Sequence, residues 1–194
     1  MSALPVVQTS GIENPRAVVL VEGVSDRVAL ETLALRRGRD LSAERVTVLP
    51  VGGAQAIGRF LNLYGPGGMN LRLAGLCDAG EEGGIRRALG RAGFGLDLDR
   101  AEMERLGFYV CQADLEDELV RCLSAPVVEE VLAAHGKLRS FRTYQKQPAH
   151  RERTTEEQLR GFLTNWKIRL AAPLVEALDL DRVPRPLDGV LTHV

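Results

Sequence analysis

The sequence predicts an open α/β fold with a mostly parallel sheet of about four strands, flanked by helices and followed by a helical C-terminal segment. Two observations lead to this prediction. Short apolar runs alternate with segments of helical periodicity up to about residue 125, which is the pattern of successive βα units. Beyond that residue every segment has helical texture, so we expect helices alone.

Four apolar runs are the expected strands. The first is AVVLV at 17–21, which is too short for a helix and precedes apolar residues at near-helical spacing in 24–36. The other three runs also precede helical segments; they are RVTVLPV at 45–51, LRLAGLCD at 71–78 and LGFYVCQ at 106–112. Before the last of them, GFGLDLDRAEMER at 93–105 is expected to be an excursion on the surface.

The C-terminal part contains several expected helices. PVVEEVLAAHG and KIRLAAPLVEALDL have helical spacing, and Thr154 with Glu157 has the capping-box spacing that starts a helix. We therefore expect an N-terminal tail at 1–14, a core at 15–125 and a helical extension at 126–194 that packs on the core.

The composition excludes several classes of protein. With 45% hydrophobic and 26% charged residues, the chain is an ordinary globular protein rather than a disordered one. Cys77, Cys111 and Cys122 lie far apart in apolar runs without a zinc-site pattern, so we expect reduced, buried thiols. Because no segment approaches the ~18 uninterrupted apolar residues of a membrane span, we expect no membrane partner and a cytoplasmic protein.

The net charge of −1 hides a basic segment at 137–169, which has nine Lys or Arg residues against three Glu residues. Such a segment either faces a polyanion or is the solvated face of its helices. In the first case Phe141 and Tyr144 would stack a base, although their helical spacing is equally that of buried residues. The cations that would then hold a nucleic-acid backbone are Lys137, Arg139, Arg142, Lys146, Arg151 and Arg153.

Acidic residues follow three of the four expected strands. Glu22 ends the first, Asp78 ends the third, and Asp114 with Glu116 follows the fourth. In a parallel sheet these ends lie at one edge, where the carboxylates would repel one another unless a cation lies between them. Hard oxygen ligands suit Mg²⁺ or Mn²⁺. Each acid alone has a structural interpretation as a helix cap or a turn residue.

Two motifs carry a resemblance to a known family. VLVEGVSD at 19–26 and LAGLCDAGEE at 73–82 resemble the Toprim domain, whose signature is Glu-Gly after the first strand and Asp-x-Asp after a later one. The form E-G-x-S-D-x-x-x-L-E at 22–31 is most similar to the OLD-like group of Toprim nucleases. ADLEDEL at 113–119 resembles the Asp-Leu-Glu motif of that group, and Lys167 lies where those nucleases have a functional lysine.

This resemblance implies a Toprim-like α/β fold and metal-dependent cleavage of nucleic acid, with DNA favoured over RNA. Glu22 and Lys167 would be catalytic: Glu22 as a general acid or base, and Lys167 as a positive charge beside the scissile phosphate. Mg²⁺ or Mn²⁺ would be the cofactor. The implied metal ligands are Glu22, Asp26, Asp78, Glu116 and Glu82, where either Glu81 or Glu82 would replace the second Asp of the signature, which is Gly80 here.

Other features limit this interpretation. No phosphate loop of the type G-x-x-x-x-G-K-[ST] occurs, so we expect a free-standing Toprim domain and leave open an ATPase partner supplied in trans. Because Gly80 replaces a ligand, the alternative is a non-catalytic module of Toprim fold that binds nucleic acid or a protein partner. A regulatory domain of receiver type is disfavoured, because the paired acids after the first strand and the lysine after the last strand are both missing.

Overall fold

The computed structural model describes residues 14–194, so the tail expected at 1–14 lies outside the described residues except for Asn14. The predicted fold class is confirmed: four parallel strands form one sheet in the order β2-β1-β3-β4. The strands are β1 Ala17–Val21, β2 Val46–Pro50, β3 Arg72–Cys77 and β4 Phe108–Val110. Val19 at the centre of β1 is paired with Val48 of β2 and Ala74 of β3.

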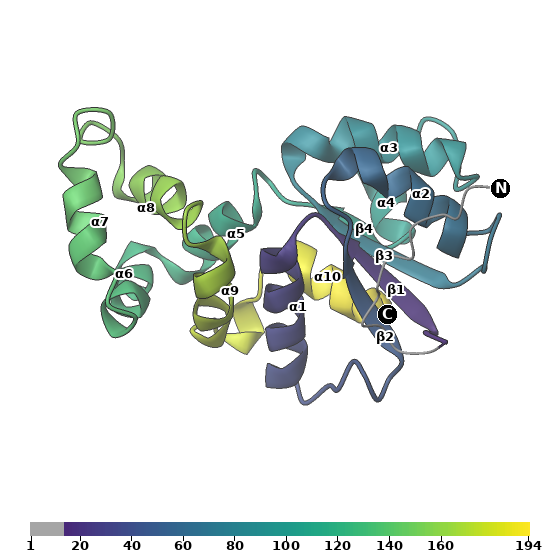
Figure 1. Cartoon of the computed structure of the whole chain (residues 1–194), viewed down its shortest axis with the longest axis horizontal. Helices are drawn as coiled ribbons and strands as arrows, with labels where there is room; N and C mark the ends of the chain where they lie inside the picture. Colours follow the sequence, from purple (N-terminus) through teal and green to yellow (C-terminus); the bar gives the residue numbers. More distant parts are fainter. Residues whose placement is uncertain (1–13) are drawn as a thin grey trace, which may run out of the picture.

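Helices cover both faces of the sheet (Figure 1). One face packs against α2 Ala54–Tyr64, α3 Glu82–Arg91 and α4 Arg100–Arg105. The other face packs against α1 Val24–Arg36 and α10 Arg185–His193. Residues of β1 alternate between the two cores, with Val19 in one and Leu20 in the other. This double burial explains why β1 is apolar at every position.

The segment expected to be a surface excursion contains α4, so that prediction is wrong. Asp99 and Glu102 form a capping box at its start, with Asp99 Oδ1 accepting from the Glu102 amide at 2.7 Å. Met103 in this helix is fully buried. The capping-box spacing was present in the sequence, and the short length of the helix concealed its periodicity.

The remaining helices form a group at one side of the sheet (Figure 1). They are α5 Leu115–Leu123, α6 Ala125–Ala134, α7 Leu138–Gln145, α8 Thr155–Leu163 and α9 Lys167–Glu176. Their apolar residues continue the core formed by α1 and α10. We call α6 to α9 the helical lobe. The predicted capping box at Thr154 is present, since its hydroxyl accepts from the Glu157 amide at 3.2 Å.

One residue joins α5 to the helical lobe. Ser124 ends α5 and precedes α6 with φ 68° and ψ 156°. This region of backbone space is populated almost only by glycine, because a Cβ atom is strained there. Ser124 is exposed, so its side chain gains no burial in return.

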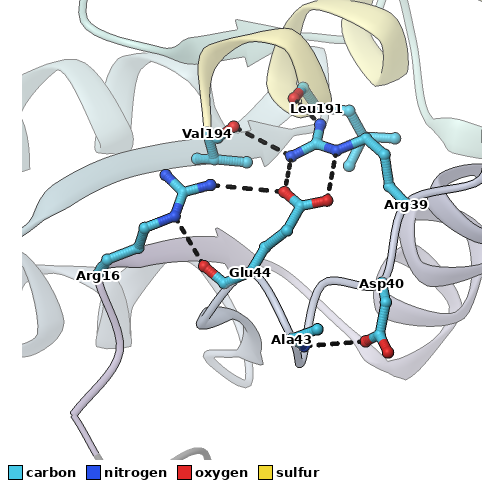
Figure 2. Close-up of polar contacts among 7 residues, drawn as sticks. All are labelled: Arg16, Arg39, Asp40, Ala43, Glu44, Leu191 and Val194. Atoms are coloured by element: carbon cyan, nitrogen blue, oxygen red, sulfur yellow. Dashed lines mark hydrogen bonds and ion pairs between the residues drawn. The ribbon is translucent and has the colours of Figure 1, made fainter.

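The C-terminal helix is tied to the loop between α1 and β2 by a group of polar contacts, which we call the Arg39–Glu44 clamp (Figure 2). The Arg39 guanidinium donates to the backbone oxygens of Leu191 and Val194, and its Nη2 lies 2.5 Å from Glu44 Oε2. Arg16 Nε donates to the Glu44 backbone oxygen at 2.7 Å. The clamp therefore joins the start of β1, the α1–β2 loop and α10.

Other expectations concern thiols and membranes. Cys77 and Cys111 are buried free thiols and Cys122 is a half-buried one, and burial raises the pKa of the Cys77 thiol to about 12. Over residues 14–194, none of the helices has the length and apolar character needed to cross a bilayer.

Candidate functional site

The carboxyl ends of the strands bring three loops together. The Gly52 amide donates to the Glu22 backbone oxygen at 3.1 Å, so the loop after β2 stays beside the end of β1. In the same way the Ala79 amide donates to the Ala113 backbone oxygen at 2.9 Å, which holds the loops after β3 and β4 together. Because β1 is paired with β3, the residues that follow these strands share one edge of the sheet.

Five carboxylates gather at this edge, which we call the acidic edge: Glu22, Asp26, Asp78, Asp114 and Glu116. Asp78 shows the gathering most clearly. Partial burial, followed by the charges of the other four acids, raises the pKa of Asp78 to about 7. Burial is the larger cause of this shift, and the four neighbouring negative charges add to it.

Burial also raises the pKa values of Glu22, Asp26 and Glu116. Burial is the largest cause for Glu22, and the neighbouring charges of Glu81 and Asp26 act in the same direction. Glu116 is only 8% exposed, and burial raises its pKa as well. Asp26 has a structural task besides, because its Oδ2 accepts from the Gly23 amide at 2.8 Å and caps α1.

Lys167 supplies positive charge among these acids. It is the first residue of α9, a helix that packs along α1 and contacts α5. Its charge lowers the pKa values of Glu22, Asp26 and Glu116 against the effect of burial. A cation is unfavourable at a helix N-terminus. Lys167 is itself exposed, and the charges of the nearby acids offset its unfavourable position at the helix N-terminus.

Glu82 does not join the acidic edge. Its carboxylate pairs with Arg86 and with Arg100, whose Nη2 lies 2.7 Å from Glu82 Oε2. Hydrogen bonding to Arg100 is the first of the causes that lower the pKa of Glu82. Glu81, by contrast, is the first charge that acts on Glu22. Of the two acids considered as replacements for the missing Asp, the geometry therefore favours Glu81 over Glu82.

Gly80 lies in the short helix η1 Ala79–Glu81, directly after Asp78 and Ala79. A Cβ atom built on Gly80 meets no other atom within 4 Å, and its φ is not in the left-handed region. The backbone thus has no need of glycine here, and an acidic side chain would fit.

The resemblance to Toprim domains implies a divalent metal ion, and the carboxylates of the acidic edge are chemically suitable ligands for one. Its ligands are carboxylate oxygens whose pKa values are raised first by burial and then by neighbouring negative charges, and a divalent cation would favour their ionised forms. The side chains are not arranged as finished ligands: in residues 14–194 no group of three or more His, Cys, Asp or Glu is placed to hold a metal ion.

Of the two interpretations of Phe141 and Tyr144, the structure supports packing within the helical lobe over base stacking. Phe141 is fully buried, with its ring 5.3 Å from that of Phe162 between centroids. Tyr144 stacks on His150 at 3.9 Å and contacts Phe162 edge to face. Both rings therefore belong to the packing of the helical lobe.

One contact at the acidic edge could not be identified from the sequence. Arg160 of α8 forms an ion pair with Asp114, with 2.8 Å between Nη2 and Oδ2. In the sequence Arg160 is one of nine cations in the basic segment, and nothing in the pattern singles it out.

Comparison with known proteins agrees with the motifs. Residues 15–79 match the family described as "Overcoming lysogenization defect protein-like, TOPRIM domain". This region contains Glu22, Asp26 and Asp78. No curated protein matches the chain with significance.

Solved structures resemble the whole chain. The C-terminal region of the Xanthomonas campestris pv. campestris OLD protein has 25% identity and a TM-score of 0.73, covering 93% of this chain and 92% of that one. The C-terminal region of the Burkholderia pseudomallei OLD protein has 19% identity and a TM-score of 0.70, covering 93% of this chain and 97% of that one. The second likeness concerns the fold alone. Residues 15–79 thus resemble the OLD-like TOPRIM domain, and the chain as a whole has the fold of an OLD C-terminal region.

Proposed function

We propose that the protein is a Mg²⁺- or Mn²⁺-dependent nuclease that hydrolyses phosphodiester bonds of nucleic acid, with DNA favoured over RNA. The resemblance to OLD-like Toprim nucleases, with which residues 15–79 agree, suggests nucleic acid as the substrate class. The observation that carries the proposal is the gathering of Glu22, Asp78 and Glu116 with Lys167 at one edge of the sheet. An ATPase partner supplied in trans would fit the family.

The metal ligands in this proposal are Glu22, Asp26, Asp78 and Glu116, with Glu81 in place of Glu82. A divalent ion bound there would neutralise charge on the phosphate and polarise its oxygens. Asp26 would keep its cap on α1 while it contributes to the site, because the Gly23 amide needs only one of its two oxygens.

Glu22 and Lys167 would carry the chemistry that belongs to the chain itself. The raised pKa of Glu22 makes its carboxylate a better proton acceptor near neutral pH than a solvated glutamate. Lys167 would hold a non-bridging oxygen of the scissile phosphate, and its charge would stabilise the transition state as negative charge builds up. The effect of the Lys167 charge on Glu22, Asp26 and Glu116 supports this role, since it shows that the lysine lies near the acids.

A second candidate is a non-catalytic module that binds nucleic acid or a protein partner. It is favoured by Gly80, which leaves the signature one carboxylate short, and by the absence of a finished ligand group in the described residues. The two candidates differ in whether the acidic edge binds the ion tightly enough for cleavage.

The test is a nicking assay on plasmid and single-stranded DNA with Mn²⁺. Glu22→Gln should retain the fold and lose cleavage, because the amide keeps the shape and removes the charge and the titratable proton. Glu31→Gln is the matched control, since Glu31 lies on α1 and burial raises its pKa too, yet the acids of the acidic edge are not among its causes.

Each outcome separates the candidates. Loss of cleavage in Glu22→Gln with full cleavage in Glu31→Gln supports the nuclease. Equal cleavage by wild type and Glu22→Gln would contradict it and indicate another active site or a contaminant. If wild type neither cleaves nor binds Mn²⁺ by calorimetry, the non-catalytic module is the better description.

A further inference from the structure

An open pocket lies between the start of α5 and the helix α8, and the proposed function makes no use of it. Its volume is about 340 Å³, which is within the range that small ligands occupy. The lining residues are Asp114, Arg153, Glu157, Arg160, Gly161 and Thr164.

The acidic groups of this pocket are already engaged in structural contacts. Asp114 Oδ1 accepts from the Asp117 amide at 2.8 Å, and Oδ2 accepts from both Nε and Nη2 of Arg160. Glu157 Oε2 accepts from the Thr154 amide at 2.9 Å and closes the cap of α8. The negative charges of the pocket therefore hold its walls together.

The positive groups, by contrast, retain donors for a ligand. Asp114 holds one edge of the Arg160 guanidinium, and within residues 14–194 Nη1 makes no hydrogen bond. Arg153 Nη1 lies 4.0 Å from the point where a Cβ of Gly161 would stand, which places this guanidinium against α8 at the pocket. Arg153 has no ion-pair partner among the described residues. Two planar guanidinium groups at one pocket are a common arrangement for binding phosphate.

The pocket adjoins the acidic edge at the end of β4. Asp114 belongs to both, because its charge helps to raise the pKa of Asp78. Asp78 is likewise among the charges that act on Arg160. Arg142, in contrast, is directed to Glu129, with 2.6 Å between Nη2 and Oε2. Arg153 and Arg160 thus lie beside the acidic edge, whereas Arg142 is held by Glu129.

We propose that this pocket binds a phosphate of the substrate strand next to the phosphate that is cleaved, with Arg153 and Arg160 as its ligands. Cleavage of the neighbouring phosphate rests on the proposed function; the binding of a strand phosphate in the pocket does not. The acidic edge repels a polyanion, so a neighbouring contact of this kind would hold the strand across it.

The experiment measures binding of a fluorescent single-stranded DNA by anisotropy over a range of salt concentrations, in Mn²⁺ and in chelator, in a Glu22→Gln background. Arg160→Gln and Arg153→Gln should each weaken binding about tenfold at low salt. Each should also flatten the log–log salt dependence by about 0.7, the value for one phosphate contact on a single strand.

Arg121→Gln is the matched control. The Arg121 side chain is 40% exposed and lies 2.8 Å from Asp117, while that of Arg160 is 42% exposed and lies 2.8 Å from Asp114. Arg121 Nη2 also lies 2.7 Å from Glu118 Oε2. Both substitutions remove one positive charge and an aspartate ion pair of the same length, but only Arg160→Gln removes them from the pocket. Arg160→Lys should retain the salt slope, and melting temperatures report whether each variant folds.

Equal salt slopes for Arg160→Gln and Arg121→Gln would overturn the proposal, as would a wild type that binds no strand. The proposed function can fail separately. If wild type does not nick DNA while Arg160→Gln loses a phosphate contact, the pocket stands and the nuclease does not. If Glu22→Gln abolishes nicking and the arginine variants bind normally, the nuclease proposal stands and the pocket proposal fails.

Discussion

Gly80 is the residue at which the chain departs from the Toprim signature, and the structure leaves room there for the missing acid. Gly80→Asp should tighten Mn²⁺ binding about tenfold, because it adds a carboxylate to a site that lacks a finished ligand group. Isothermal calorimetry measures the affinity. Gly83→Asp is the control: it adds the same charge three residues later, where the Cβ would meet Arg87 Nη1 at 3.4 Å. Equal affinities for wild type and Gly80→Asp would show that Glu81 already fills the place.

Asp78 makes the free energy of unfolding depend on pH. Its folded pKa of about 7 lies above the ordinary aspartate value of 3.8, so the folded state binds the proton more tightly than the unfolded state does. The contribution of Asp78 to the stability of the metal-free protein is therefore most favourable below pH ~4 and is lost as pH rises through ~7. Asp78→Asn removes this loss. In chelator it should stabilise the protein by about 1–2 kcal/mol at pH 8, after discount for solvent screening, and by almost nothing at pH 4.

Thermal melts of wild type and Asp78→Asn across this pH range give the comparison. A difference that is constant with pH would mean that the substitution acts through packing or hydrogen bonding rather than through charge.

Single elements were predictable where the local pattern was strong. The four strands were confirmed because each is an apolar run followed by a turn, and burial on both faces demands such runs. The helix α4 was missed because its six residues bury chiefly Met103, which is too little for a periodicity. A capping box at Asp99 and Glu102 was its only local sign.

The attachment of α10 to the α1–β2 loop is an element-scale feature that no local pattern reveals. Glu44→Gln weakens the Arg39–Glu44 clamp, because the amide loses the charge that Arg39 and Arg16 face. We expect a loss of about 1 kcal/mol in unfolding free energy at pH 7. Hydrogen bonding to Arg39 lowers the folded pKa of Glu44 below 4.5, so this contribution is present above that pH and is lost as pH falls through the folded pKa.

Urea titrations of both proteins at pH 7 and at pH 3 measure this effect. A deficit of the same size at both values would show that the clamp stabilises α10 without using the charge of Glu44.

At the scale of the whole molecule, the sequence was informative about the residues at the end of each strand and silent about the contacts made across the sheet. The sequence could predict that Glu22 and Asp78 lie near each other, because parallel strands place their carboxyl ends at one edge of the sheet. Lys167 could be suggested only by resemblance, since its place beside Glu22 depends on how α9 packs along α1. The choice between Glu81 and Glu82 depended on Arg100, which belongs to a helix that the sequence concealed.

Ser124 gives the joint between α5 and the helical lobe an unusual response to mutation. Glycine inside a helix or a strand destabilises a protein by about 0.5–1 kcal/mol through the entropy of the unfolded chain. At Ser124 the strained backbone costs about 1–3 kcal/mol, and glycine would release it. Ser124→Gly should therefore raise the melting temperature, measured by circular dichroism. Glycine at this position would also allow a wider range of angles between α5 and the helical lobe. The variant would therefore resist heat better, yet it would hold Arg153 and Arg160 less firmly beside the carboxylates of the acidic edge.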